Sequence, residues 1–278
     1  MESRRRQVMG VVNVTPDSFS DGGRYADHAA AIEHGLALAG EGADWVDVGG
    51  ESTRPRAEPV PVDEELRRVI PVVEGLAAQG VAVSIDTRKE PVARAAVAAG
   101  ARMVNDVSAS LGEVAAAEGV AFVAMHMLGD PRTMQANPTY GDVVGEVRDF
   151  LVARADAARA AGAPEVWIDP GIGFGKTLEH NLDLLANLDA LAATGYPVLL
   201  GTSRKSMLGT LAARADRSPA RAAVGAEEDV VPPTGDRLEG SVATAAWSWL
   251  RGATMLRVHE VAATVRALAA CERVLAAA

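Results

Sequence analysis

The sequence has almost no cysteine, which limits its covalent cross-linking. Its single cysteine, Cys271, lies in an alanine-rich final segment, and one cysteine cannot form an intramolecular disulfide. Free cysteine is among the most buried residue types, so we interpret Cys271 as a small residue that fills part of the core. Stabilisation of the fold by an internal disulfide is therefore excluded.

The sequence also lacks long apolar runs and an excess of basic residues. Only five residues, Val8 to Val12, lie between residues 1–7 and Asn13, and this run is too short for a secretory signal or a membrane span. The net charge is −10, whereas nucleic-acid binding needs a basic face that neutralises phosphates. We therefore expect a cytoplasmic enzyme that binds neither a membrane nor nucleic acid.

The composition that is present suits one globular domain. The 278 residues are 49% apolar and 23% charged, enough for a sizeable core. No feature of the chain argues for a second unit. We therefore expect residues 1–278 to form a single domain.

The segment from Val8 to Gly23 shows the pattern on which the rest of the chain is built. An apolar, β-branched run without polar alternation predicts a strand buried on both faces. Asn13 ends this run, and a loop rich in Thr, Pro, Asp, Ser and Gly follows. A buried strand that leads into a polar loop is typical of ligand sites in α/β proteins.

The same strand, polar loop and helix recur along the chain. We predict strands near residues 8–12, 45–50, 81–85, 103–104, 121–127, 166–168, 197–200 and 255–258. Eight such units at roughly 30-residue spacing are typical of a (β/α)8 TIM barrel in the α/β class. A doubly wound open sheet is the alternative, but no Gly-x-Gly-x-x-Gly fingerprint follows the first strand.

Several local expectations accompany this architecture. Asp27 and Asp63 are predicted N-caps, and one helix is expected to run through Leu182, Leu185 and Leu188. The loop at 128–140 is long enough to suggest a working lid. The segment Gly240–Leu250, with Trp247 and Trp249, is apolar around much of its circumference. Such a helix is either a homodimer interface or packed against the barrel.

Polar residues follow nearly every predicted strand, where a barrel would bring them together at its catalytic face. Singly, each could be a cap or turn residue. They are Asn13, Asp47, Asp86, Asn105, Asp106, His126, Asp169, Ser203, Lys205, Arg257 and His259.

Two parts of this set suggest anion binding. Residues 201–206 place a helix N-terminus after the seventh strand, where unpaired N–H groups attract anions. Arg257 and His259 are two residues apart on the eighth strand, so both side chains point the same way. Asp169, in contrast, could pair with an amidine-like N–H edge of a ligand. We therefore expect a site for a polar heterocycle and an anion.

The chain resembles the dihydropteroate synthase family of pterin-binding enzymes on eight motifs in order. They are Asn13-Val-Thr-Pro-Asp-Ser-Phe-Ser-Asp21, Gly50-Glu-Ser-Thr-Arg-Pro55, Ser84-Ile-Asp86, Asn105-Asp106, Met125-His-Met127 with Pro131-Arg-Thr-Met-Gln135, Asp169-Pro-Gly-Ile-Gly-Phe174, Ser203-Arg-Lys205 and Arg257-Val-His259.

The resemblance implies a transferase of folate biosynthesis. Such an enzyme joins 6-hydroxymethyl-7,8-dihydropterin diphosphate to 4-aminobenzoate with Mg²⁺, and it is expected to be a homodimer. No protein nucleophile is needed, because diphosphate is a good leaving group and the dihydropterin ring can delocalise the resulting cation.

The resemblance also implies roles for individual residues. The pterin would be held by Asp86, Asn105, Asp169 and Lys205, and Met125 would also contact substrate. Diphosphate would be held by Asn13, Arg257 and His259, with Asn13 also binding Mg²⁺. The aminobenzoate site would be shaped by Phe19, Thr53, Arg54, Pro55, Phe174 and Ser206, with Asp17 and the first loop closing over it. The catalytic set is Asp86, Asp169, Lys205, Arg257 and His259.

One residue departs from the family pattern, because Arg56 stands where the family usually has glycine. If that position needs a positive φ, Arg56 would reshape the loop and change the affinity for aminobenzoate. Three alternative functions are a pterin-binding paralogue without catalysis, a methyltetrahydrofolate-dependent corrinoid methyltransferase, and a barrel enzyme of unrelated chemistry. A methyl transfer releases no diphosphate, so the second would not need the Arg257 and His259 pair.

Overall fold

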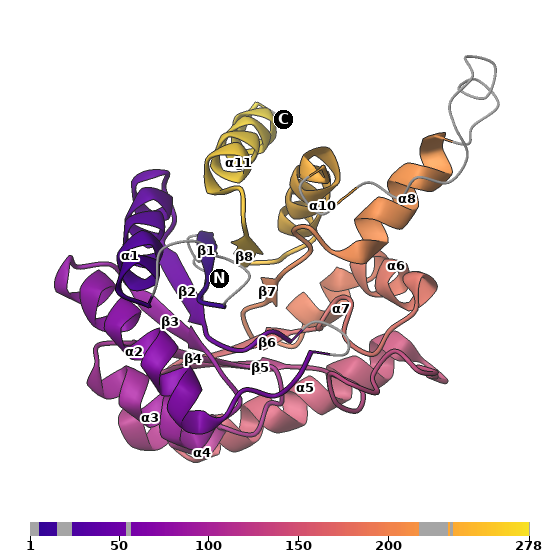
Figure 1. Cartoon of the computed structure of the whole chain (residues 1–278). Coiled ribbons are helices and arrows are strands. Elements are labelled where there is room, and N and C mark those ends of the chain that lie inside the picture. Colours follow the sequence, from indigo (N-terminus) through magenta and orange to yellow (C-terminus); the bar gives the residue numbers. More distant parts are fainter. Residues whose placement is uncertain (1–5, 16–23, 54–56, 217–232, 234–235, 278) are drawn as a thin grey trace.

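The computed structural model describes residues 6–15, 24–53, 57–216, 233 and 236–277. In these ranges, strands and helices alternate around one ring (Figure 1). The strands are β1 Gln7–Asn13, β2 Trp45–Gly49, β3 Val83–Asp86, β4 Met103–Asp106, β5 Ala121–Met125, β6 Val166–Asp169, β7 Leu199–Leu200 and β8 Met255–Val258.

All paired strands run parallel, in the order β6-β5-β4-β3-β2-β1-β8-β7. A bridge between Ile168 and Val198 joins β6 to the residue just before β7, and the Ile168 N–H donates to the Pro197 carbonyl at 3.0 Å. These contacts close the ring. The predicted (β/α)8 barrel is therefore confirmed, and the open doubly wound sheet is wrong.

Helices cover the outside of the ring (Figure 1). They are α1 Arg24–Gly40, α2 Val62–Ala78, α3 Glu90–Ala98, α4 Gly112–Glu118, α5 Val143–Ala160, α6 Leu178–Ala186, α7 Leu188–Ala192, α8 Ser206–Asp216, α10 Leu238–Leu250 and α11 Val261–Ala276.

Three helix expectations are wrong. α1 begins at Arg24, so Asp27 lies inside it. In α2 the N-cap is Pro61 and Asp63 lies in the first turn, where a carboxylate still favours the positive end of the helix dipole. The single helix expected through Leu182, Leu185 and Leu188 is two helices. The chain turns at Asn187, with φ −112° and ψ 31°, and its side-chain amide donates to the Asp183 carbonyl at 2.9 Å.

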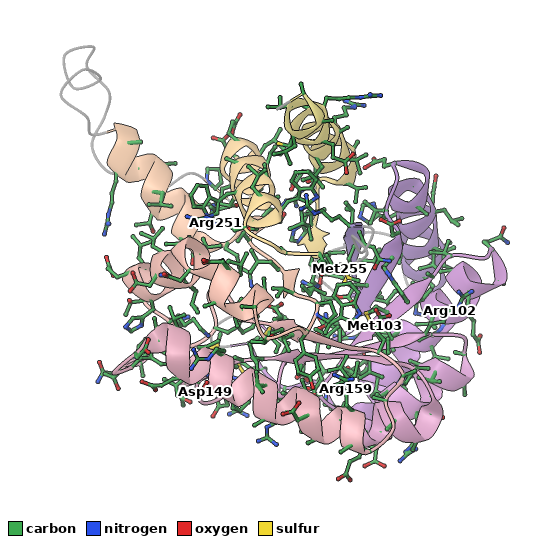
Figure 2. All side chains as sticks on the ribbon, turned by 180° about the vertical axis from the view of Figure 1, so that it is seen from behind. Arg102, Met103, Asp149, Arg159, Arg251 and Met255 are labelled. Carbon is green, nitrogen blue, oxygen red and sulfur yellow. The ribbon has the colours of Figure 1, made fainter. Side chains whose placement is uncertain are left out.

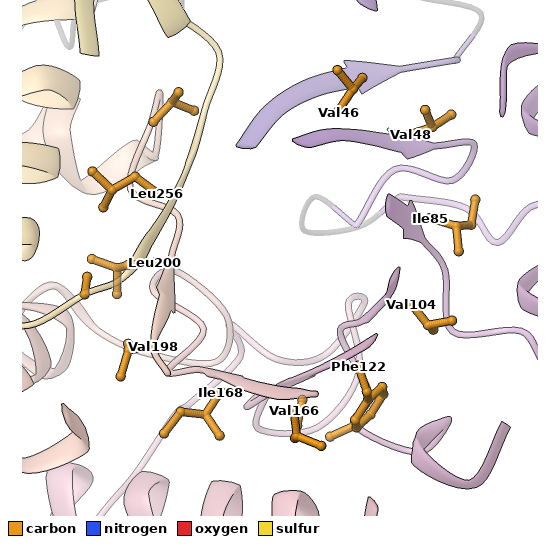
Figure 3. Close-up of a cluster of buried hydrophobic side chains, with 14 of the residues drawn as sticks. Val46, Val48, Ile85, Val104, Phe122, Val166, Ile168, Val198, Leu200 and Leu256 are labelled. Carbon is orange, nitrogen blue, oxygen red and sulfur yellow. The ribbon is translucent and has the colours of Figure 1, made fainter. Parts of the chain in front are cut away.

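Alternate residues of each strand face the helices. Apart from Asp106 at the end of β4, this outward set is apolar, and it includes Val46, Ile85 and Phe122, which have no exposed surface. Figure 3 shows such side chains directed from the strands toward the surrounding helices. Because successive strand residues point to opposite faces, the intervening residues must face the barrel axis.

The inward set changes character along the axis. Near the amino ends of the strands it is apolar, and Figure 2 shows two of its members, Met103 and Met255, in the middle of the molecule. Two residues further along the same strands stand Asn105 and Arg257. One alternating pattern therefore builds an apolar plug below and a polar mouth at the carboxyl ends, where barrel enzymes place their active sites.

Candidate active site at the barrel mouth

Arg257 of β8 is the central cation of the mouth. Its Nε donates to Asp47 Oδ2 at 2.6 Å and its Nη2 donates to Asp86 Oδ2 at 2.8 Å. Asn105 donates from Nδ2 to the same Asp47 oxygen at 3.0 Å. These four residues lie on different strands, so the guanidinium is fixed by carboxylates across the barrel.

The charges of this group depend on one another. The net pKa of Asp86 is raised to about 7. Burial is the main cause of the rise, the charge of Arg257 opposes it, and the charges of Asp47, Glu65 and Asp106 add to it. For Arg257, burial lowers the pKa, but Asp47 and Asp86 outweigh that effect and the net shift is upward. The guanidinium therefore stays charged, as a permanent cation beneath any ligand in the mouth.

Asp169 ends β6 and is buried, with 6% of its surface exposed. Its Oδ1 accepts a hydrogen bond from the Gly171 N–H at 2.7 Å. Burial raises the pKa of its carboxyl, and the Gly171 N–H and the charges of Lys205 and Arg257 oppose that rise. Asp169 can therefore accept a further hydrogen-bond donor from a ligand.

Lys205 and Phe174 bring the seventh and sixth loops together. The Lys205 ammonium lies 4.1 Å from the centre of the Phe174 ring, a cation–π contact. The net pKa of Lys205 is lowered to about 8. Burial is the main cause, the charge of Asp169 opposes it, and the charge of Arg257 adds to it. The lysine is thus a cation near neutral pH that loses its charge in mild alkali.

His259 lies just beyond β8 and contacts the seventh loop. Its Nδ1 lies 2.9 Å from Ser203 Oγ, and that hydroxyl donates to Glu260 Oε2 at 3.1 Å. Arg204, with φ 59°, also pairs with Glu260. Helix α8 begins at Ser206, as expected. The positively charged turn and the helix N-terminus therefore follow one another at this side of the mouth.

The second loop is tied to the third by Glu51. Its carboxylate pairs with Arg88 at 3.0 Å and with Lys89 at 2.6 Å, and it accepts the Val60 N–H at 2.7 Å. The half-buried Thr53 lies between Glu51 and Val60, the two residues that this hydrogen bond joins. Glu51 was not assigned a role from sequence, although it lies in the quoted Gly50–Pro55 motif.

The other predicted residues differ in how much the structure says of them. Asn13 ends β1, where it is half-buried and faces the axis in register with Gly49. Met125 of β5 is buried and pairs in register with Asp169 of β6. Ser206 is exposed. Outside the described residues are Asp17, Phe19, Arg54, Pro55 and Arg56, together with the closure and loop-shape hypotheses that depend on them.

The donor set suits a cation shared with substrate. Among the described residues no three His, Cys, Asp or Glu side chains gather in a way that could hold a metal ion. Mg²⁺, however, often takes only one or two protein ligands and completes its shell with water and substrate phosphates. The amide oxygen of Asn13 at the end of β1 fits that arrangement.

Sequence reasoning missed three residues that act on the mouth. The sequence pattern marks Asp47 and His126 as polar strand ends without a role in the site, and it does not distinguish Lys176. In the structure Lys176 Nζ lies 2.9 Å from His126 Nδ1, with both side chains buried. Asp47 shares the inward register of Asp86 and Asn105, so strand alternation could have identified it.

The chain is similar to known proteins over most of its length. A family model described as "Pterin binding enzyme" matches residues 9–259. The dihydropteroate synthase of Mycobacterium leprae is 50% identical over 271 residues, covering 94% of this chain and 91% of that protein. The Escherichia coli K12 dihydropteroate synthase is 42% identical, covering 97% of this chain and 92% of that protein.

Solved structures agree with this similarity. Xanthomonas albilineans dihydropteroate synthase with 4-aminobenzoic acid superposes with a TM-score of 0.86 at 49% identity, covering 98% of this chain and 94% of that one. The same enzyme in complex with 7,8-dihydropteroate gives a TM-score of 0.83 at 47% identity, with the same coverage.

Proposed function

This chain belongs to the pterin-binding enzyme family as a dihydropteroate synthase, and we propose how its barrel mouth performs the reaction. The enzyme transfers the pterin methylene group of 6-hydroxymethyl-7,8-dihydropterin diphosphate to the amine of 4-aminobenzoate. It releases diphosphate and forms 7,8-dihydropteroate, a step of folate biosynthesis.

The pterin ring binds in the polar mouth, above the apolar plug. Asp169, whose Oδ1 also accepts from Gly171 N–H, accepts hydrogen bonds from the amidine-like edge of the ring. Asp86, Asn105, Met125 and Lys205 hold the other sides. The observation that carries this proposal is the inward-facing group around Arg257, because its charged and amide side chains come from four strands and meet at the mouth.

Diphosphate binds beside Asn13, Arg257 and His259. As the carbon–oxygen bond breaks, its electron pair goes to the departing diphosphate, and these groups stabilise the charge where it develops. A Mg²⁺ ion held by Asn13 and the diphosphate would supply further charge neutralisation. The amine nitrogen then forms the new carbon–nitrogen bond and releases its proton.

Aminobenzoate binds at the rim, against Phe174, Thr53 and the start of α8 at Ser206. Arg54, Pro55, Phe19 and Asp17 complete and close this part of the site. Correct orientation of the amine and exclusion of water both matter, because water would otherwise capture the electrophilic carbon.

The first test of this proposal is product formation. The purified protein should form dihydropteroate from the two substrates with Mg²⁺, and chelation should stop it. Asp169→Ala and Arg257→Ala should each lower kcat/KM by roughly a hundredfold or more, as loss of a buried charged contact does. Calorimetric pterin binding by wild-type protein that forms no product would instead identify a non-catalytic pterin-binding paralogue.

We propose further that the enzyme works in the cytoplasm as a homodimer. In the described part of the chain, no helix is both long and apolar enough to cross a membrane. The outer face of α10 exposes Trp247 and Leu250, with 44% and 50% of their surfaces accessible. An exposed apolar face of this kind suits a second copy of the chain.

A further inference from the structure

Lys176 is a buried lysine that the proposed reaction does not use, and burial lowers its pKa to about 7. The chain has three lysines, Lys89, Lys176 and Lys205, and Lys176 exposes only 3% of its surface. A buried ammonium is costly unless its donors are satisfied. The groups around its Nζ therefore indicate what this residue does.

Lys176 ends a loop that lies directly on the preceding one. A Cβ added at Gly171 would stand 1.9 Å from the His126 carbonyl oxygen, and one at Gly175 would stand 2.7 Å from the Leu128 carbonyl oxygen. Both glycines have positive φ, at 66° and 62°. Only glycine permits so close an approach in this conformation, so the sixth loop rests on the fifth.

Side chains of the fifth loop complete this contact by donating to carbonyls of the sixth. Gln135 donates from Nε2 to the Gly173 carbonyl at 2.8 Å, and the Tyr140 hydroxyl donates to the Gly175 carbonyl at 2.8 Å. The segment that we expected to be a lid is thus tied to its neighbour at these points.

The Lys176 ammonium lies between the two loops. It donates to the Phe174 carbonyl at 3.0 Å and to the His126 carbonyl at 3.4 Å, and it lies 2.9 Å from His126 Nδ1. Burial, followed by the charge of Lys176, lowers the His126 pKa to about 3. The neutral ring can therefore accept a hydrogen bond from Lys176.

Phe174 connects this clamp to the site. Its carbonyl is bound by Lys176 while its ring covers the Lys205 ammonium at 4.1 Å. Moving the backbone of Phe174 would shift the ring and expose Lys205. We propose that Lys176 is a positioning residue that fixes Phe174, and through it Lys205, for binding of the dihydropterin diphosphate. This inference rests on the proposed function.

The test compares Lys176→Met with wild type in full steady-state kinetics. Methionine keeps most of the side-chain volume but has no donor for the two carbonyls and the ring. We expect KM for dihydropterin diphosphate, and its calorimetric Kd, to rise about tenfold, the equivalent of one lost charged hydrogen bond. Wild-type protein without turnover would refute the proposed function, whereas the binding comparison would still test Lys176.

The control is Ser248→Ala, which removes another buried donor. Ser248 has no exposed surface and donates to the Thr244 carbonyl within α10 at 2.6 Å, away from the mouth. Both variants should lose thermal stability, but Ser248→Ala should keep the wild-type KM and Kd. If Lys176→Met is destabilised and yet keeps both constants, the role is structural only and the inference is overturned.

Tyr140→Phe provides a second variant in case Lys176→Met does not fold. It removes one donor to the sixth loop and keeps the ring, which packs at 6.1 Å from His126. We expect KM and Kd for dihydropterin diphosphate to rise about threefold, because one neutral hydrogen bond to the same loop is lost. Unchanged constants in Tyr140→Phe would also contradict the positioning role of this clamp.

Discussion

His126 shows how a single buried side chain makes the stability of this barrel depend on pH. Its ring packs edge-on against Phe150 at 5.0 Å, and its Nδ1 faces Lys176. Protonation would place a second cation next to the ammonium in a buried site. The folded protein therefore keeps His126 neutral at pH values where an exposed histidine would be charged.

The sign of the effect follows from the direction of this shift. The folded pKa of about 3 lies below the ordinary value of 6.5, so the unfolded chain binds the proton first. This contribution to stability is complete above pH 6.5 and is lost as the pH falls toward 3. The free energy of unfolding should fall by up to about 1.4 kcal/mol per pH unit from this residue alone.

Urea unfolding between pH 6.5 and 4 measures this dependence. The free energy of unfolding of His126→Phe should depend less steeply on pH than that of wild type, by about the contribution of one bound proton. His34→Phe, at an exposed position of α1, should keep the wild-type slope. Equal slopes for His126→Phe and wild type would show that His126 is not held neutral by the fold.

At the residue scale, the sequence predicted the types of site residue better than their contacts. Arg257 and Asp86 could be chosen because each lies near the carboxyl end of a strand and within one of the eight motifs. Asp47 accepts hydrogen bonds from both Arg257 and Asn105. This arrangement depends on the register between strands that are far apart in the chain, and residue spacing does not specify that register.

At the scale of elements, the contact between the fifth and sixth loops depends on glycine. Gly171 combines a φ of 66° with an approach to the His126 carbonyl that leaves no room for a side chain. Its N–H also donates to Asp169. One glycine therefore couples the packing of two loops to the orientation of the Asp169 carboxylate, which we propose binds the pterin.

Gly171→Ala should be far more harmful than the same change at Gly195. Gly195 has a similarly positive φ of 85°, but a Cβ there would meet no atom within 4 Å. We expect Gly195→Ala to cost about 1 kcal/mol for the left-handed backbone, and Gly171→Ala roughly 2 to 3 kcal/mol more because of the overlap. Chemical denaturation gives both values, and equal losses would exclude a close approach of the loops.

The elements themselves were largely predictable because parallel strands buried on both faces are apolar throughout. All eight strands and the closed barrel were expected, whereas the N-caps at Asp27 and Asp63 and the continuous helix through Asn187 were not confirmed. A carboxylate near a helix start, such as Asp63, reads equally well as a cap or as a first-turn residue. The break at Asn187 was hidden because leucines continue the apolar spacing on both sides of it.

At the scale of the whole molecule, α10 divides its large side chains between two environments. Trp249 is buried, with 2% of its surface exposed, and the Arg6 guanidinium lies 3.5 Å from the centre of its ring. It packs on the barrel, so our inclusion of Trp249 in a dimer face was wrong. Trp247, Leu250 and Leu238 remain exposed on the helix.

Leu250→Glu tests whether this surface joins two copies of the chain. Wild type should sediment as a dimer at micromolar concentration, and its Tm should rise with protein concentration. The added carboxylate should yield a monomer whose Tm no longer depends on concentration. Glu113→Gln, on the first turn of the distant α4, is the control and should remain dimeric, whereas a dimeric Leu250→Glu would place the interface elsewhere.

The scarcity of lysine has a practical consequence for handling the enzyme. Lys176 and Lys205 lie at or beneath the mouth, and Lys89 is bound to Glu51 and Glu65 at the second and third loops. All 24 other basic residues are arginines, since Lys and Arg together number 27 and lysines account for three. An amine-reactive dye or sensor chip therefore finds its side-chain targets near the substrate-binding end of the barrel. Attachment through lysine should compete with substrate, and a tag engineered onto the outer helices would leave the mouth accessible.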